Sequence, residues 1–377
     1  MEMTIQNGIS PSGRVTLPPS KSEAIRAALL IGLAGGDPRL AVAGFPEPYC
    51  GDLCDALLAA KELKSAYVGE SAALMRFMIP IQAVKWGRVE VSADEVLYKR
   101  GYAEIEDCLG VSLAPIPGTT LIHKRVRLGR KNRFGIDCSR SSQFLSGLLM
   151  ALPLMKRDCE IILKNPPVSK PYSDMTLDFV RLFGGRVEET ETGYITHPSR
   201  YAVPEEIPVM GDASYAAVFE AMNLLGGSVE ISGASGTTRQ PDRRFAEYAA
   251  MSDCDITDCP DLLPLLAAVA CGRRGDTVIR GTARLRTKES DRESGTVELI
   301  NGLGGSAEVG NDRVVVHGTG SLRGGAVDPQ DDHRLCFAAA VAATICSEPV
   351  TIKNVECTRK SAPRFPEDLA GMGMLSL

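Results

Sequence analysis

The sequence predicts an α/β protein in which one structural unit recurs along the chain. Ala- and Leu-rich helical segments recur, each opens with a small, polar or charged cluster, and several lead through a turn into an alternating strand pattern. We expect each unit to contain a helix, a strand, a second helix and a pair of strands. Six copies indicate two equivalent halves of three units each.

The first helix of each unit is the clearest part of the repeat. Apolar residues continue through these segments at helical length, and a glycine or a glycine pair ends several of them. In chain order they are SKSEAIRAALLIGLAGG from Ser20, ESAALMRFMIPI from Glu70, SRSSQFLSGLLMALPL from Ser139, GDASYAAVFEAMNLLGG from Gly211, PDLLPLLAAVACG from Pro260 and DDHRLCFAAAVAATIC from Asp331.

Strands and second helices are expected between these segments. The strands read CEIILKN, SVEISG, DTVIRGT and PVTIKNV, a second helix reads KPYSDMTLDFVRLFGG, and a hairpin reads GRVEETETGYITH. The first helices start about 70 or about 50 residues apart, so we expect two shortened units that lack the hairpin, after residues 40–65 and after Phe245. The open alternative is that Ala/Leu-rich helices resemble one another without a common repeat.

Charge and cysteine content limit the class of protein. The chain has 377 residues and a net charge of −5, from 42 Lys and Arg against 47 Asp and Glu, which argues against a general nucleic-acid partner. The 11 cysteines are scattered, and neither Cys50 with Cys54 nor Cys254 with Cys259 has a second pair at zinc-site spacing. We therefore expect reduced thiols, no metal and a cytoplasmic location.

Targeting and membrane signals are not expected in this chain. Its first residues contain no apolar run of signal-peptide length, and no stretch reaches about 18 uninterrupted apolar residues. We therefore expect no membrane partner.

The start of the first helix raises a question of charge. Lys21, Ser22 and Arg26 occupy the first turns of a segment that is otherwise apolar. A cation at a helix N-terminus is mildly unfavourable, because the helix dipole and the free N–H groups are positive there. An anion held between them resolves the conflict, so several such helix starts in one cleft would bind phosphates or carboxylates. The alternative is that the two cations extend from the helix start into solvent.

Other polar clusters open later helices or turns. They are Ser141, Ser142 and Gln143; Ser169, Lys170 and Tyr172; Arg286, Lys288, Glu289, Asp291 and Arg292; His333 and Arg334; and Lys360 in TRKS. Asp261 stands at the mouth of an apolar helix, where it is either a helix cap or a general base. KESDR is equally typical of a solvated turn, and His333 of a packed or capping residue. The sequence has no P-loop, no G-x-G-x-x-G entry, no H-E-x-x-H and no G-x-S-x-G.

Taken together, these residues resemble a known family. LPPSKSEAIRAALL, DCSRSSQFLSGLLMALPL, SKPYSDMTLDFVRLFGG, GDASYAAVFEA, TKESDR, DDHR and CTRKSAPRF resemble segments of 5-enolpyruvylshikimate-3-phosphate synthases, in the family's order. The resemblance implies the two-domain enolpyruvyl transferase fold, an inside-out α/β barrel with three βαβαββ-type units in each domain. It places one domain at residues 19–211, the other at 1–18 and 212–377, hinges near Pro18–Pro19 and Gly211–Asp212, and the active site between them.

The resemblance also implies an activity and its participants. Members transfer the enolpyruvyl group of phosphoenolpyruvate to the 5-hydroxyl of shikimate 3-phosphate and release phosphate, by addition and elimination, without metal or cofactor. The expected partners are these two small molecules, with no nucleic acid and no membrane, and we expect a monomer. Two polyanions must be held together by cations, and developing charge needs fixed donors.

Site residues follow from the same resemblance. Asp261 is implied as the base, Glu289 as the acid, and Lys21 as a catalytic contact of both substrates. The implied shikimate 3-phosphate site comprises Lys21, Ser22, Arg26, Ser141, Ser142, Gln143, Ser169, Tyr172, Asp261 and Lys288. The implied phosphoenolpyruvate site comprises Lys21, Arg100, Gln143, Arg292, Arg334 and Lys360.

The chain departs from the family pattern at several positions. GESAALMR stands where the family usually has G-N-[SA]-G-T-A-M-R, so Glu70 replaces an amide, Ala72 a glycine and Ala73 a threonine. We hypothesise that glyphosate, the inhibitor that occupies the phosphoenolpyruvate pocket in the family, binds poorly here. Gly101 replaces a proline and Ala362 an aromatic residue. The alternatives are a non-catalytic binding or assembly module of the same fold, a UDP-N-acetylglucosamine enolpyruvyl transferase, or an RNA 3′-phosphate cyclase-like protein.

Overall fold

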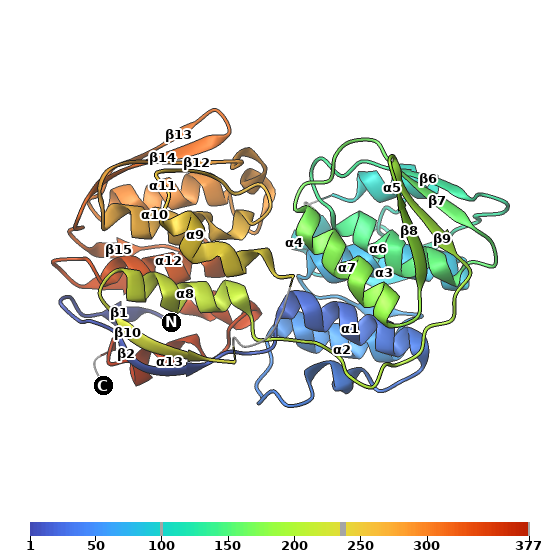
Figure 1. The fold of residues 1–377 in the computed structure, drawn as a ribbon, viewed down its shortest axis with the longest axis horizontal. Helices are drawn as coiled ribbons and strands as arrows, with labels where there is room; N and C mark the ends of the chain where they lie inside the picture. The colour runs from blue at the N-terminus through green and yellow to red at the C-terminus, as the bar shows by residue number, and fades with distance from the viewer. Residues whose placement is uncertain (99–100, 234–238, 376–377) are drawn as a thin grey trace.

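The computed structural model describes residues 1–98, 101–233 and 239–375, and its helices and strands gather in two lobes (Figure 1). Within these ranges the buried apolar side chains form two separate clusters. One cluster runs from Ala24 to Tyr201, and the other joins Met3–Leu17 to Tyr215–Met374. The parts packed around them are called the first lobe and the second lobe below.

The first lobe contains helices α1 to α7 and strands β3 to β9. Its helical elements are α1 (Lys21–Ala34), η1 (Pro38–Val42), α2 (Gly51–Glu62), α3 (Ala72–Trp86), α4 (Glu95–Tyr98), α5 (Ala103–Leu109), α6 (Gln143–Ala151), η2 (Leu152–Leu154) and α7 (Lys170–Leu182). Its strands are β3 (Ala66–Tyr67), β4 (Arg88–Ser92), β5 (Leu121–Arg125), β6 (Arg133–Ile136), β7 (Cys159–Leu163), β8 (Arg186–Thr190) and β9 (Gly193–His197).

The second lobe contains both ends of the described chain. Its helical elements are α8 (Ala213–Leu224), η3 (Pro241–Arg244), α9 (Phe245–Ala249), η4 (Pro260–Leu262), α10 (Leu263–Cys271), η5 (Ala283–Thr287), α11 (Arg292–Gly302), α12 (His333–Ala343), η6 (Val355–Lys360) and α13 (Phe365–Gly371). Its strands are β1 (Met3–Ile5), β2 (Ser12–Thr16), β10 (Ser228–Ser232), β11 (Asp253–Asp255), β12 (Arg274–Arg280), β13 (Ala307–Gly310), β14 (Arg313–Thr319), β15 (Gly325–Val327) and β16 (Val350–Ile352).

The Ala- and Leu-rich helices lie inside each lobe. In α1, α3 and α6 of the first lobe, and in α8, α10 and α12 of the second, most side chains are buried, which is why these helices read as apolar on nearly every face. Small residues allow the close approach. A Cβ added at Gly147 would lie 2.6 Å from the carbonyl oxygen of Arg76, so α6 touches the backbone of α3.

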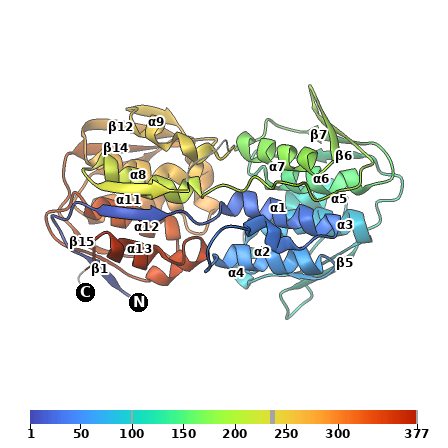
Figure 2. The same cartoon turned by 60° about the horizontal axis from the view of Figure 1, so that its bottom comes forward.

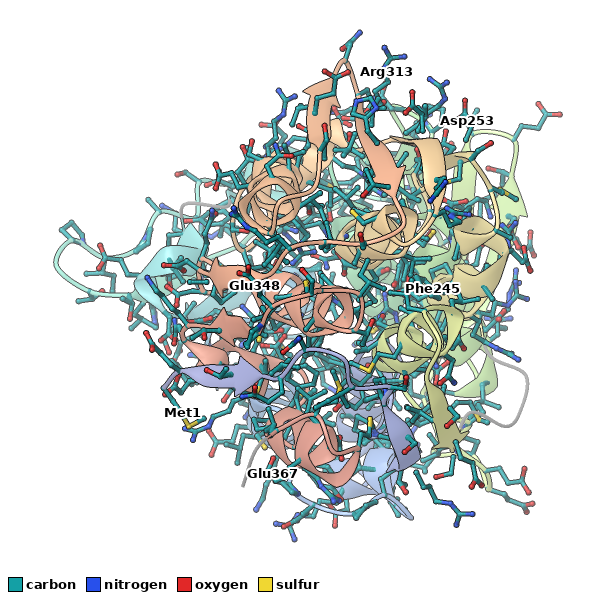
Figure 3. The ribbon with its side chains drawn as sticks, turned by 90° about the vertical axis from the view of Figure 1, so that its left-hand side faces the viewer. Met1, Phe245, Asp253, Arg313, Glu348 and Glu367 are labelled. Atoms are coloured by element: carbon teal, nitrogen blue, oxygen red, sulfur yellow. The ribbon has the colours of Figure 1, made fainter. Side chains whose placement is uncertain are left out.

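The sheets lie around these helices. Among the described residues the strand orders are β3-β4-β5 and β6-β7-β9-β8 in the first lobe, and β10-β2, β11-β12-β14-β13 and β1-β16-β15 in the second. Figure 3 looks at the end of the second lobe, where Asp253 and Arg313 lie at the β11–β14 sheet and Glu367 lies on α13. The polar side chains therefore face outward over sheets and surface helices that enclose the apolar helices.

The fold predicted from sequence is confirmed. The six predicted first helices are α1, α3, α6, α8, α10 and α12, the four predicted strands are β7, β10, β12 and β16, and GRVEETETGYITH forms the antiparallel β8–β9 pair. Units one and four are short as expected. Only η1 and α2 precede the two-residue β3, and α9 leads through the three-residue β11 directly to η4.

The chain crosses between the lobes along two neighbouring segments. In Figure 2 one segment runs from β2 into α1 and the other returns toward α8. They hydrogen-bond to each other, since Ser20 N donates to Met210 O at 2.7 Å and Asp212 N donates to Pro18 O at 2.9 Å. An isolated antiparallel bridge joins Pro19 to Gly211.

Candidate active site

The starts of the six inner helices line one cavity between the lobes. Its empty volume is about 1340 Å³, including the part open to solvent. First-lobe residues from the starts of α1, α3 and α6 face second-lobe residues from the starts of α8, α10 and α12 across it. The predicted site residues among its lining are Lys21, Ser22, Arg26, Ser141, Ser142, Gln143, Ser169, Tyr172, Asp261, Lys288, Glu289, Arg292 and Arg334.

Lys21 begins α1 directly after its cap. Ser20 Oγ accepts a hydrogen bond from Glu23 N, and Lys21 then extends into the cavity, where its Nζ lies 3.0 Å from Asp52 Oδ2. Burial disfavours the charged ammonium, but Asp52 outweighs this cost and the pKa of Lys21 is raised. Asp52, which sequence reasoning missed, therefore keeps Lys21 protonated and directed into the cavity.

Arg26 is held by the first lobe itself. Its guanidinium donates to Thr176 Oγ1 at 2.6 Å, to Ser22 O at 2.6 Å and to Tyr172 O at 3.1 Å. It also stacks over the Phe77 ring, and the residue is only 3% exposed. Arg26 thus links α1 to α7 at the wall of the cavity. The alternative of a cation extended into solvent is wrong.

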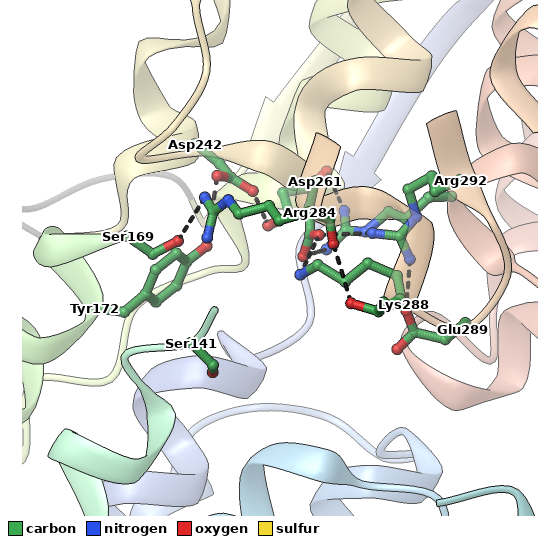
Figure 4. A network of polar contacts seen from close by, with 12 residues as sticks. Ser141, Ser169, Tyr172, Asp242, Asp261, Arg284, Lys288, Glu289 and Arg292 are labelled. Carbon is green, nitrogen blue, oxygen red and sulfur yellow. Dashed lines mark hydrogen bonds and ion pairs between the residues drawn. The ribbon is translucent and has the colours of Figure 1, made fainter. Parts of the chain in front are cut away.

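A group of hydroxyls and amides lies at the starts of α6 and α7. Ser142 Oγ donates to Ser169 O at 3.3 Å, and Gln143 Oε1 accepts from Arg76 Nη1 at 2.7 Å. Ser169 precedes α7 with φ of 50°, a left-handed conformation that lets the chain turn sharply into the helix. The hydroxyls of Ser141 and Ser169 both line the cavity, so this corner presents several neutral donors together (Figure 4).

Arg292 joins the two carboxylates predicted to be base and acid. Its Nη1 lies 2.6 Å from Asp261 Oδ1 and its Nη2 lies 2.7 Å from Glu289 Oε2 (Figure 4). Asp332, the cap of α12, accepts from Nε at 2.8 Å and from Nη2 at 3.1 Å. The Arg292 side chain is 1% exposed, so the solvated-turn alternative for KESDR is wrong.

Asp261 is surrounded by cations. Besides Arg292, Lys288 Nζ lies 3.2 Å and Arg334 Nη2 lies 3.8 Å from its carboxylate. Burial alone would raise the pKa of Asp261, but Lys288, Arg292 and Arg334 together hold it well below its usual range. The carboxylate makes no cap hydrogen bond to α10 within the described structure, so the capping alternative is wrong.

Arg334 and His333 open α12 with unused hydrogen-bonding capacity. Arg334 is 7% exposed, yet its Nε has no acceptor among the described residues, and its Nη1 reaches Ser214 O at a long 3.4 Å. His333 Nδ1 also lacks a partner there. Burial and the neighbouring Arg334 hold the pKa of His333 well below its usual range, so the imidazole is neutral. Buried polar atoms without hydrogen-bond partners are typical of a ligand-binding site in its unliganded state.

Lys360 lies at an adjoining cavity rather than at the main one. Its Nζ is 3.1 Å from Glu70 Oε2 of the first lobe and 3.9 Å from Glu289 Oε1. Glu70, Lys288 and Glu289 line both cavities, so Lys360 stands at their junction. Arg100, also predicted to contact phosphoenolpyruvate, lies outside the described residues.

Two further cavity contacts were missed by sequence reasoning. Arg284 of η5 reaches across the lobes and donates to Ser169 Oγ at 3.0 Å. Tyr172 OH donates to the buried Asp242 at 3.5 Å. Arg284 stands three residues before the quoted TKESDR segment, and only its position in the fold distinguishes it from a surface arginine.

Other departures from the family pattern also have local explanations. Gly101 has φ of +70°, which the proline ring cannot adopt, so the chain path here differs from that of a proline-bearing relative. Ala362 is 2% exposed and belongs to the core of the second lobe.

In the described ranges no group of three or more His, Cys, Asp or Glu side chains is arranged to hold a metal ion. No helix in the described part of the chain has the length and apolar character needed to cross a membrane.

Comparisons with known proteins all lead to one family. The family model described as EPSP synthase (3-phosphoshikimate 1-carboxyvinyltransferase) matches residues 50–251 and 242–369. A 3-phosphoshikimate 1-carboxyvinyltransferase of Clostridium kluyveri is 29% identical, with 96% of this chain and 95% of the relative covered. One of Erwinia tasmaniensis is 29% identical, with 99% of each chain covered. A solved EPSP synthase of Acinetobacter baumannii superposes with a TM-score of 0.78 at 19% identity, over 99% of this chain and 98% of that one.

Proposed function

The chain belongs to the EPSP synthase family, and from this premise we propose how its residues carry out the family's reaction. The enzyme transfers the enolpyruvyl group of phosphoenolpyruvate to the 5-hydroxyl of shikimate 3-phosphate and releases phosphate, a step toward chorismate and the aromatic amino acids. The observation that supports the catalytic roles is that Asp261 and Glu289 both contact Arg292. Beside them the buried Nε of Arg334 has no acceptor among the described residues.

Asp261 acts as the general base and Glu289 as the general acid. Asp261 takes the proton of the 5-hydroxyl of shikimate 3-phosphate. The hydroxyl oxygen then bonds to C2 of phosphoenolpyruvate while Glu289 protonates C3. In the elimination the Glu289 carboxylate, which gave its proton in the addition, takes a proton from C3. The C–H electrons re-form the C2–C3 double bond, and the C2–O bond to phosphate breaks with its electrons. The proton held by Asp261 passes to the departing phosphate. Arg292 keeps the two carboxylates at fixed positions on one guanidinium.

Substrate binding adjusts the basicity of Asp261. In the ligand-free enzyme Lys288, Arg292 and Arg334 hold the pKa of Asp261 low, which makes it a weak base. A bound phosphate draws Lys288 and Arg334 toward itself, so their stabilisation of the Asp261 carboxylate falls and its proton affinity rises. The base therefore becomes effective when both substrates are in place.

The remaining predicted residues hold the two anions. Shikimate 3-phosphate is bound by Lys21, Ser22, Arg26, Ser141, Ser142, Gln143, Ser169, Tyr172, Asp261 and Lys288, most of which lie in the first lobe. Phosphoenolpyruvate is bound by Lys21, Arg100, Gln143, Arg292, Arg334 and Lys360, with Lys21 between the two molecules. The unmatched Nε of Arg334 supports its role as an anion ligand.

The lobes act as two domains that close over the substrates. The first domain is residues 19–211, the second is 1–18 with 212–377, and the paired crossings near Pro18–Pro19 and Gly211–Asp212 serve as the hinge. Closure excludes water from the reacting atoms. One chain supplies both sides of the cavity, which supports a monomer, and free cysteine thiols support a cytoplasmic location.

Phosphate release tests the whole assignment. Purified protein is mixed with shikimate 3-phosphate and phosphoenolpyruvate without added metal, and inorganic phosphate is followed over time. Phosphate release that requires both substrates is the expected result. Binding of both substrates without turnover would instead indicate a non-catalytic binding module. Release with UDP-N-acetylglucosamine in place of shikimate 3-phosphate would indicate the other enolpyruvyl transfer.

A further inference from the structure

Arg284 carries a positive charge into the cavity without a carboxylate partner. It belongs to η5 of the second lobe, yet its Nη2 donates to Ser169 Oγ of the first lobe at 3.0 Å and also to Thr257 O. Neither acceptor is charged. Within the described structure no carboxylate lies within ion-pair distance of Arg284, and its Nε has no acceptor.

The neighbouring cations of the cavity are compensated differently. Lys21 pairs with Asp52, Lys288 with Asp261, and Arg292 with Asp261 and Glu289. Burial lowers the pKa of Arg284, which reports the cost of holding its charge away from water. Asp261 and Asp258 offset this cost only in part, because the pKa of Arg284 stays below its usual value. A guanidinium remains charged nonetheless, so a bound anion would compensate the rest.

We propose that Arg284 is a ligand of the phosphate group of shikimate 3-phosphate, supplied by the second lobe to a phosphate that Ser141 and Ser169 bind from the first. The proposal rests on the function proposed above, in which these serines form part of the shikimate 3-phosphate site. Arg284, Ser141, Ser169 and Tyr172 line the same cavity (Figure 4).

The chemistry of the group fits a phosphate. The serine hydroxyls donate single neutral hydrogen bonds, which orient a phosphate but leave its charge unbalanced. Arg284 adds a charge and a planar fork that matches two phosphate oxygens. Because Arg284 already contacts Ser169, a phosphate bound at Ser169 Oγ lies within reach of the unused N–H groups. The same contact ties shikimate 3-phosphate binding to closure of the lobes.

Binding of shikimate 3-phosphate and of shikimate distinguishes this role from others. Isothermal titration calorimetry is carried out with each ligand on the wild-type enzyme, Arg284→Gln and Arg284→Lys, after circular dichroism has verified folding. For Arg284→Gln we expect the dissociation constant of shikimate 3-phosphate to rise about 10- to 100-fold, as for loss of a charged hydrogen bond. The dissociation constant of shikimate, which lacks the phosphate, should be unchanged. Arg284→Lys should lie between.

The controls separate this proposal from the proposed function. Arg280→Gln removes an exposed arginine of β12 that pairs with Asp253, and it should bind both ligands like the wild type. If Arg284→Gln weakens the binding of both ligands equally, or of neither, the phosphate assignment is overturned. The proposed function still stands in that case if the wild-type enzyme turns over. A wild-type enzyme that binds shikimate 3-phosphate no better than shikimate would overturn the proposal and the proposed function together.

Discussion

Glu70 and Lys360 form an ion pair across the two lobes, with Oε2 of Glu70 3.1 Å from Nζ of Lys360. The Glu70 carbonyl oxygen accepts from the same ammonium at 3.4 Å. Glu70 stands where the family resemblance has an amide, and Lys360 is one of the proposed phosphoenolpyruvate ligands. The Glu70 carboxylate is therefore paired with an ammonium that phosphoenolpyruvate would use. Phosphoenolpyruvate must displace Glu70 from Lys360 in order to bind there.

Glu70→Gln should lower the KM for phosphoenolpyruvate several-fold with little change in kcat. The amide removes the competing charge and the repulsion of an incoming trianion, while the chemistry takes place elsewhere. Half of the Glu70 side chain is exposed, so the effect is modest. Steady-state kinetics with varied phosphoenolpyruvate measure it, and Glu189→Gln, on the remote β8–β9 hairpin, serves as the control. An unchanged or higher KM would refute the competition.

Ala72→Gly should make the enzyme more sensitive to glyphosate. Ala72 starts α3 and lines the cavity, so its methyl group takes space at the proposed phosphoenolpyruvate pocket. Inhibition constants of the wild type, Ala72→Gly and a glycine-bearing family member give the comparison. We expect the wild-type constant to be the highest of the three. A wild-type constant no higher than that of the glycine-bearing enzyme would reject the hypothesis of poor binding.

Asp261→Asn and Glu289→Gln should each lower kcat about 10²- to 10⁴-fold, as expected for loss of a general acid or base. Both amides keep the side-chain shape, and Lys288, Arg292 and Arg334 remain to bind the substrates. Single-turnover phosphate release measures the chemistry, and calorimetry measures shikimate 3-phosphate binding. Glu298→Gln, an exposed substitution on α11, is the matched control. A variant that retains a near-normal rate would remove that residue from the acid–base pair.

Asp242→Asn should stabilise the enzyme near neutral pH. Burial raises the pKa of Asp242 to about 6, with Arg334 opposing the shift, from an ordinary value of 3.8. Between these values the folded state binds more protons at Asp242 than the unfolded state. The contribution of Asp242 to stability is therefore most favourable below about pH 4 and falls as pH rises through about 6. The neutral amide of Asp242→Asn does not ionise, so the variant avoids this loss of unfolding free energy. The loss is on the order of 3 kcal/mol once the pH is well above about 6.

Urea unfolding at about pH 4.5 and about pH 7.5 tests the sign of this dependence. The stability advantage of Asp242→Asn over the wild type should grow at the higher pH. Asn retains an oxygen that can accept from Ser214, which now donates to Asp242. Asp107→Asn, at an exposed position, should show no such growth. Parallel pH profiles for the wild type and Asp242→Asn would contradict the buried, proton-binding carboxyl.

Much of the fold was predictable because it rests on local patterns. The apolar length of α1, the cap at Ser20 and the left-handed Gly35 at its end are all legible in SKSEAIRAALLIGLAGG. The alternation in SVEISG and CEIILKN likewise identified β10 and β7. The pairing of β2 with β10, by contrast, joins residues far apart in the chain, and no local pattern indicates it.

The candidate site divides in the same way. Helix-start clusters such as Ser141–Gln143 and DDHR were identifiable because they gather more polar groups, and in DDHR a cation, than the single cap that a helix start needs. The partners Asp52 and Arg284 were not, since an aspartate in an amphipathic helix or an arginine in a short 3-10 helix resembles an ordinary surface residue. The joint contact of Arg292 with Asp261, Glu289 and Asp332 was also not predictable, because Asp261 and Asp332 lie 31 and 40 positions from Arg292 along the chain.

The sequence alone determined the repeating helix–strand units, the two shortened units and the cations and hydroxyls that open the inner helices. These features are local, since hydrophobic period, caps and turns depend on residues a few positions apart. Only the tertiary structure decided which charges meet. Coulomb energy depends on distance and burial, and tertiary folding sets both. The second lobe brings Asp261 and Asp332 to Arg292, and the meeting of the two lobes brings Lys360 to Glu70 and Arg284 to Ser169.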